Sequence, residues 1–228
     1  MTSTLIIAAI ALSLIIGAAW GLFLPLPARL KGNAMAFGGG ALLSSLVLEL
    51  FVPAINSAGM SAAATALLLG ALVFSVLDHV IDEVWTNAGG IAVLAAISLD
   101  GIPENFALGA EMAQSSGAGL SALAGAIFLS NLPEAAAGAH SMRDRWSRRS
   151  VMALWTGTAL VLSSCTLVGR WALTDVQPES LSLISAFAGG AVIASLVTEI
   201  FPQAHREDDD LTGISSALGV ICATMLSR

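Results

Sequence analysis

Charged residues are scarce in this chain: Asp, Glu, Lys and Arg make up 11% of its 228 residues, whereas 56% are hydrophobic. The mean hydropathy of +0.85 lies far outside the range of soluble domains. The composition therefore excludes a soluble globular protein and indicates a membrane protein with several spans.

Several other features are also missing. The two cysteines, Cys165 and Cys222, both lie in apolar runs, so we expect small buried residues rather than a disulfide or a metal pair. The net charge of −7, with no basic patch, argues against nucleic-acid binding. The sequence also lacks HExxH, a Gly-x-Ser-x-Gly elbow and a protease-type Asp dyad, so we do not expect an enzyme.

Long apolar runs predict membrane-spanning helices, because about 20 apolar residues cross the hydrocarbon core. Eight runs follow one another with short connections, which predicts an all-α, polytopic membrane protein with one transmembrane domain over residues 1–228. The predicted spans are Ser3–Leu24, Ala34–Pro53, Ser61–Val80, Gly89–Met112, Gly117–His140, Ser150–Leu173, Leu181–Pro202 and Leu211–Leu226.

The basic residues of the short loops predict the orientation, since such loops stay preferentially in the cytoplasm. Most of them fall between predicted spans one and two, five and six, or seven and eight: Arg29, Lys31, Arg143, Arg145, Arg148, Arg149 and Arg206. Only Arg170 and Arg228 fall on the other side. Both termini are therefore expected on the extracytoplasmic side.

The second and seventh predicted spans resemble each other at a constant offset of 150 positions, with Glu49 matching Glu199 and Gly40 matching Gly190. Spans five apart cross the membrane in opposite directions, as in the inverted repeats of secondary transporters, whose substrate site lies near the midplane. The chain then divides into spans one to three (about 3–80), a central pair (89–140) and spans six to eight (150–226). The paired glycines are interpreted as positions of close helix packing.

Two glutamates lie within the central pair, each directly after a proline: Glu104 after Pro103 and Glu134 after Pro133. An ionised carboxylate at mid-bilayer depth is costly unless it is paired, so such residues are functional candidates. Each proline frees the carbonyl four residues earlier, and we expect kinks that offer further oxygen ligands.

Polar neighbours share helix faces with these glutamates, Asp100 with Glu104 and Asn131 with Glu134. Carboxylates brought together in a low dielectric repel, so at least one must hold a proton or share a cation. Oxygen ligands suit hard and borderline divalent ions, and exchange of protons for metal would make transport depend on pH. The alternative is that the carboxylates only hydrogen-bond to neighbouring helices, which explains one such residue better than a matched pair.

At these residues the chain resembles the ZIP (Zrt/Irt-like) family of divalent-metal transporters. The matching stretches read Asp100-Gly101-Ile102-Pro103-Glu104-Asn105 and Ser130-Asn131-Leu132-Pro133-Glu134-Ala135. That family has eight spans in a three-two-three arrangement, outside termini, and ligands on helices four and five in Pro-Glu motifs with leading histidines. The Pro-Glu elements match here, and the histidines do not.

The resemblance implies metal ligands at Asp100, Glu104, Asn131, Glu134 and Glu199. Gly101 stands at a ligand position and has no side chain to offer, so one metal ion is expected rather than two. Ser130 also occupies a ligand position, with a weaker group. The loss of imidazole shifts the expected substrate toward manganese, iron or magnesium, whereas family membership favours zinc or iron, and the identity of the ion stays open.

The function implied is divalent-cation transport across a prokaryotic inner membrane, with metal ions and membrane lipids as partners and a homodimer left open. A non-transporting, ZIP-like metal-binding or scaffold homologue is the main alternative, because the histidines are missing. An intramembrane hydrolase using the carboxylates as acid and base is a more distant one.

Four secondary candidates lie near predicted helix ends. One is the cluster Asp78, His79, Asp82 and Glu83, a cytoplasmic exit site or an ordinary solvated helix end. Another is the loop from His205 to Asp210, which could attract cations or simply be solvated. Glu111 is expected near an outer entrance, and His140 at the membrane interface.

Overall fold

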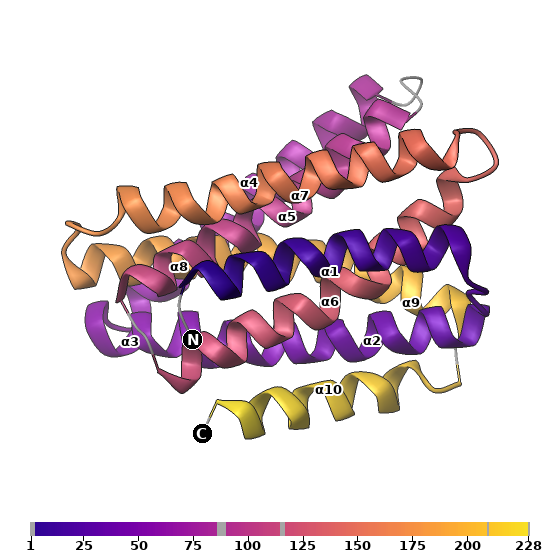
Figure 1. Cartoon of the computed structure of the whole chain (residues 1–228). Coiled ribbons are helices and arrows are strands. Elements are labelled where there is room, and N and C mark those ends of the chain that lie inside the picture. The colour runs from indigo at the N-terminus through magenta and orange to yellow at the C-terminus, as the bar shows by residue number, and fades with distance from the viewer. Residues whose placement is uncertain (1–2, 86–89, 115–116, 209, 228) are drawn as a thin grey trace.

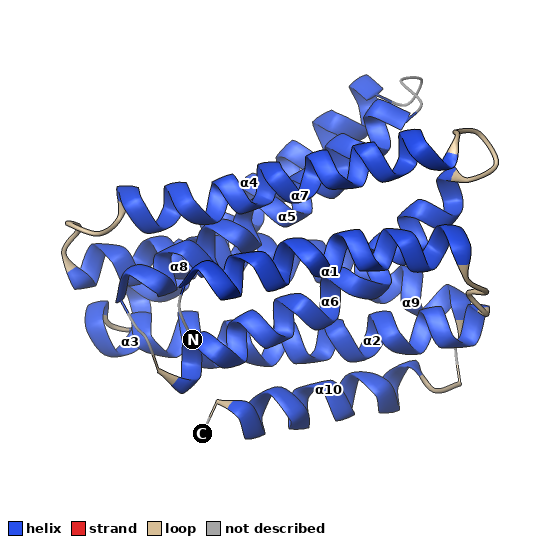
Figure 2. Cartoon of the chain, in the orientation of Figure 1, coloured by secondary structure: helices blue, strands red, loops and turns tan. Residues whose placement is uncertain are grey.

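The computed structural model describes residues 3–85, 90–114, 117–208 and 210–227, apart from the side chains of 82–85, 90–100, 114 and 118. This part of the chain is helical and contains no strand (Figure 2), which confirms the predicted all-α class. Its elements are α1 (Ser3–Phe23), α2 (Ala28–Ser45), η1 (Leu46–Phe51), α3 (Val52–Ala58), α4 (Met60–Trp85), α5 (Gly90–Gln114), α6 (Ala118–Met142), α7 (Arg148–Ala172), α8 (Pro178–Ser195), η2 (Leu196–Ile200), α9 (Phe201–Glu207) and α10 (Thr212–Leu226). The two η elements are π-helices.

Among the described residues, six helices are long and apolar enough, by length and composition, to cross a membrane. They are α1, α2 continued through η1 and α3, α4, α6, α7, and α8 continued through η2 and α9. Of the two remaining predicted spans, α10 has only 15 residues, and α5 lies partly outside the described side chains. This fold is compatible with a membrane protein.

The helices lie side by side in one bundle whose two ends differ (Figure 1). The N- and C-termini lie at one end, and the α1–α2, α6–α7 and α9–α10 connections lie at the other. Those connections and the first turns after them hold most of the basic residues, so the basic end and the terminal end of the bundle are opposite ends.

Two segments have the same sequence of elements. The bounds of α2 and α8 differ by the 150 positions found in the sequence, and each helix continues into a π-helix and then a seven-residue α-helix. The chain runs through α2 and α8 in opposite directions (Figure 1).

The closest helix pairs connect these segments to the other half of the chain. The pairs α2–α10 and α4–α8 form one set, and α1–α6 and α5–α7 form the other. A Cβ at Gly40 of α2 would overlap the backbone carbonyl of Ser216 in α10, and one at Gly190 of α8 would overlap that of Leu67 in α4. The interpretation of these two glycines as close-packing positions is confirmed, since only a missing side chain allows this approach.

The prolines of the central pair do not interrupt their helices. α5 is continuous through Pro103 and α6 through Pro133, so neither proline ends its helix, and the kinks expected there stay a prediction. The departure from α-helical geometry lies instead in η1 and η2. A carbonyl freed by a proline can be accommodated within a helix when a neighbouring helix covers it. The carbonyl of Leu129, freed by Pro133, is covered in this way by Gly38 of α2.

Candidate metal centre

Glu104 lies on α5 among buried side chains and is 5% exposed. One turn further along α5, Leu108 belongs to the largest apolar cluster, as does Ile127 on the facing part of α6. The carboxylate is therefore held in an apolar surrounding where few polar groups can solvate it.

Ser130 of α6 contacts Glu104 directly. Its Oγ lies 3.2 Å from Oε1 of Glu104 and 3.1 Å from the carbonyl oxygen of Ile127, to either of which it can donate. The sequence presented Ser130 only as a weak ligand position. In the structure, it is a hydrogen-bond donor that joins the two central helices at the carboxylate.

Three carboxylates from three elements come together around α6. Glu134 lies within electrostatic range of both Glu104 on α5 and Glu199 on η2. Like charges in such a setting repel strongly because little water screens them. The arrangement therefore has an excess of negative charge that a proton or a cation would relieve.

Asn131 adds an amide to this region. It is 3% exposed, and its Nδ2 has no hydrogen-bond partner in the described structure. Because Nδ2 is a donor, an acceptor such as a water oxygen would stabilise it, whereas a cation could be bound only by Oδ1 of the same amide.

Two predicted ligand positions have different outcomes. Asp100 belongs to α5, but its side chain lies outside the described residues. At Gly101 a Cβ would meet Leu162 of α7, so this position faces α7. A larger side chain at 101 would need Leu162 to move, which fits the expectation that this position supplies no ligand.

Glu104, Glu134 and Glu199 lie within electrostatic range, but their carboxylates do not converge on one position where a single ion could bind all three. Among the described residues, no group of three Asp, Glu, His or Cys side chains lies close enough to hold a metal ion. The role of Glu104, Asn131, Glu134 and Glu199 as ligands stays a prediction.

Both π-helices carry the glutamate of the repeat, Glu49 in η1 and Glu199 in η2. π-Helical turns are rare and often occur at functional sites. The sequence signal for them is a proline soon after each glutamate, Pro53 and Pro202, where the next α-helix begins. The sequence analysis used both glutamates as evidence of a repeat and Glu199 as an expected metal ligand, and it missed the change in helix type.

Glu49 has a different environment from Glu199. It accepts a hydrogen bond from Ser227 Oγ, just beyond the end of α10, and its carboxylate occupies the space that a Cβ at Gly119 of α6 would take. Glu49 therefore lies toward the end of the bundle that contains the termini.

Asn105, next to Glu104, connects α5 to α7. Its Nδ2 donates to the carbonyl of Gly101 (2.9 Å), and its Oδ1 accepts from Thr166 Oγ1 (3.1 Å). It is 1% exposed, so both ends of a fully buried amide have partners. This residue was not singled out from the sequence, although it anchors the helix at the position of the glutamate.

The stretch predicted as a loop from His205 to Asp210 is helical up to Glu207, where α9 ends, and Asp209 lies outside the described residues. Glu207 forms an ion pair with Lys31 at the start of α2, and Asp208 accepts a hydrogen bond from Asn33 Nδ2 (2.6 Å). Asn33 Oδ1 also accepts from Ser215 Oγ of α10 (2.7 Å). The carboxylates of Glu207 and Asp208 thus hold three helix ends together, which explains them without a cation.

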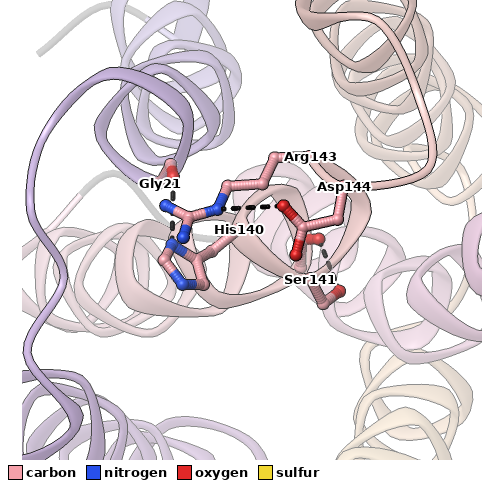
Figure 3. Close-up of polar contacts among 6 residues, drawn as sticks. Gly21, His140, Ser141, Arg143 and Asp144 are labelled. Carbon is pink, nitrogen blue, oxygen red and sulfur yellow. Dashed lines mark hydrogen bonds and ion pairs between the residues drawn. The ribbon is translucent and has the colours of Figure 1, made fainter.

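The other secondary candidates lie near helix ends. Asp78 of α4 is half-buried and His79 is exposed, while the side chains of Asp82 and Glu83 lie outside the described residues. Glu111 is 8% exposed on α5. His140 reaches from α6 to α1, where its Nδ1 lies 3.3 Å from the carbonyl oxygen of Gly21. Figure 3 shows its ring beside Arg143, which pairs with Asp144 at 3.7 Å.

The fold and site together define an all-helical protein with several helices of membrane-spanning length and a group of carboxylates of which Glu104 is buried and Glu134 and Glu199 are half-buried. No family model matches the chain, and no curated protein matches it.

Proposed function

We propose that the chain is a ZIP-like transporter that moves a divalent metal cation across the membrane through a site on α5 and α6. The observation that carries the proposal is the gathering of Glu104, Glu134 and Glu199 from three separate elements within electrostatic range. Asn131 and Asp100 complete the proposed ligand set.

Electrostatics supports a cation as the substrate. Three carboxylates with little access to water cannot all stay ionised without compensation, and a divalent ion supplies two positive charges at once. Because protons and metal compete for the same oxygens, transport is expected to weaken when the medium is acidified.

The absence of a close triad among the described side chains is consistent with a substrate that must leave. A transported ion has to be bound and then released, so its ligands must be able to separate. In this proposal the ion draws the carboxylates together, and without it their repulsion keeps them apart.

The proposed architecture has eight spans in a three-two-three inverted repeat. The matched bounds of α2 and α8, their opposite directions and their equivalent π-helices support it. The exchanged pairs α2–α10 and α4–α8 support it further, because a two-fold operation converts one pair into the other. Both termini are placed on the extracytoplasmic side of a prokaryotic inner membrane, since they lie at the end opposite the basic connections.

The proposed substrate is zinc, iron or manganese. Carboxylate and amide oxygens bind all three, and the order of affinities favours zinc over manganese when ligands are equal. Competition among metals, rather than affinity for one metal, is therefore the informative measurement.

Flux into liposomes tests the proposal. The purified protein, reconstituted with a metal-sensitive dye inside, is expected to admit a divalent metal, and Glu134→Gln and Glu104→Gln are expected to reduce the rate by about tenfold or more, equivalent to at least ~1.4 kcal/mol. Glu179→Gln, at an exposed position on α8, is the matched control and should transport normally. Equal flux in all four proteins would contradict the assignment of the site.

A non-transporting metal-binding or scaffold homologue is a second candidate, favoured by the lack of a close triad among the described residues. The same liposomes distinguish the two functions. Metal bound by the protein, lost in Glu134→Gln, with no flux in the native chain would identify the second function.

A further inference from the structure

A groove follows the outer face of α7 from the basic end of the bundle. It has a volume of about 520 Å³ and is lined mainly by Trp146, Ser150, Ala153, Leu154, Gly157 and Val161. Ser150 through Val161 recur at helical spacing, so they form one stripe. Gly157 is one of the lining residues, and a Cβ there would project into open space because it would meet no other atom within 4 Å.

The length of the groove matches one leaflet of a bilayer. Its stripe extends over eleven residue steps of α7, or about 16 Å at the rise of an α-helix. Half of a hydrocarbon core is about 15 Å thick. With α7 across a bilayer and Trp146 at the interface, the groove would be long enough to extend to the midplane.

The rim of the groove differs from its wall in chemistry. Trp146 stands at the opening, where an amphipathic ring prefers the membrane interface. Arg145 precedes it in the chain, and Arg149 lies one helical turn before Ala153 on the same stripe. Both arginines are exposed and have no ion pair within the described structure.

The two neighbouring arginines are engaged elsewhere. Arg148 lies over the ring of Phe23 in α1, with its guanidinium carbon 5.3 Å from the ring centre. Arg143 pairs with Asp144 at 3.7 Å. Arg145 and Arg149 are thus the pair of this connection whose charge remains for a ligand at the groove.

We propose that this groove binds one anionic phospholipid, with an acyl chain along α7 and the phosphate between Arg145 and Arg149. Charge complementarity selects the occupant, because basic residues at a membrane surface attract anionic lipid by about 1 kcal/mol each. A second groove, of about 360 Å³ between α4, α5 and α8, has only apolar lining residues and therefore gives no such selection. The proposal requires α7 to lie in a bilayer and does not depend on metal transport.

Brominated lipids test the proposal, because bromine on an acyl chain quenches a tryptophan in contact with it. The full-length protein is reconstituted into phosphatidylcholine and phosphatidylglycerol vesicles in which only one of the two lipids is brominated. The Trp146 signal is the difference between the native protein and Trp146→Phe. We expect phosphatidylglycerol to be enriched about tenfold over phosphatidylcholine at Trp146.

Two variants locate the lipid. Arg145→Gln with Arg149→Gln should reduce that enrichment to about the level of the bulk mixture, while Gly157→Leu should fill the groove and lower quenching by either lipid. Gly213→Leu is the matched control, since a Cβ there also meets open space, on α10. Equal quenching by the two lipids in the native protein, or unchanged enrichment in the arginine variant, overturns the proposal. It is also overturned if Gly157→Leu converts a dimer to a monomer without altering quenching, which would assign the groove to a second copy.

Discussion

The π-helices η1 and η2 occupy equivalent places in the two halves of the chain, and their glutamates have different surroundings. Glu199 of η2 lies within electrostatic range of Glu134, which belongs to α6, one of the two helices of the candidate centre. Glu49 of η1 accepts a hydrogen bond from Ser227 and abuts Gly119, near the end of the bundle. The same backbone device thus presents one carboxylate to the centre and another to a helix end.

This difference separates what a repeat determines from what it leaves free. The repeat determines backbone course, helix type and the glycines of close contact, because these depend on local sequence and on the helix against which each segment packs. The partner of each side chain depends on the third element nearby, and that element differs in the two halves. Equivalent position in a repeat is therefore a poor guide to equivalent function.

The largest effect is expected at the shared glycines. Gly40→Val and Gly190→Val should each cost more than about 3 kcal/mol, because the new side chain would meet a backbone carbonyl that cannot rotate away. The measurement is the yield of monodisperse protein and its thermal unfolding in detergent. Gly213→Val, in open space, should behave like the native chain, and failure of only one of the two glycine variants would show that the halves are not equivalent in packing.

The glutamates should respond unequally. Glu199→Gln is expected to reduce metal flux by about tenfold or more, whereas Glu49→Gln should keep it within about twofold of the native rate, because Glu199 lies within electrostatic range of Glu134 and Glu49 is bound to Ser227 at a helix end. Flux is measured in liposomes with matched protein content. Equal losses in the two variants would remove the functional distinction between η1 and η2.

A smaller loss of stability is expected at the start of α2 than at the shared glycines. There, Asn33 is hydrogen-bonded to the other half of the chain, whereas the start of α8 has only a hydrogen bond within its own helix. Asn33→Ala should destabilise the protein by about 1–3 kcal/mol, because Asp208, which is 7% exposed, loses its donor and Ser215 loses its acceptor. At the start of α8, Ser182 Oγ donates to Pro178 of its own helix (2.8 Å), and Ser182→Ala should cost about 1 kcal/mol or less. Thermal unfolding in one detergent compares the two directly, and equal shifts would contradict this asymmetry.

The smallest effect is expected at Ser227. Ser227→Ala should lower stability by about 1 kcal/mol, since one hydrogen bond to Glu49 is lost at a partly exposed position. Metal flux in liposomes should be unchanged. A clear loss of transport in this variant would place Glu49 in the transport path after all.

Hydropathy predicted the helices better than it predicted their ends. The first predicted span, Ser3–Leu24, differs from α1 by one residue at its end. The second was predicted to begin at Ala34, whereas α2 begins at Ala28 and includes Lys31. An apolar window stops at a charged residue, but the helix continues because Lys31 pairs with Glu207 outside the apolar region.

The candidate site was predictable in part. A buried carboxylate in an apolar run is visible in the sequence, and Glu104 is buried as its position suggested. The π-helices were not predictable from spacing alone, because an extra residue in a helical turn is stabilised by tertiary contacts. Nor could the sequence reveal that Gly101 faces Leu162, or that Asn105 accepts a hydrogen bond from Thr166 of α7 while its Nδ2 donates within α5.

The exchange of partners between the halves has a consequence for biosynthesis. α4 is made early, but α8, on which it packs most closely, is made only after three further helices have followed. In a membrane, α4 would have to stay without its final neighbour during that interval. Its composition suits this delay: within Met60–Ile81, an 18-residue window has a mean hydropathy of 2.1, and only 17% of that window is buried in the finished protein. Because α2 packs on α10 and α4 packs on α8, neither half of the chain contains the partners that it needs. A product truncated midway would therefore lack these two helix pairs and could not form the complete bundle.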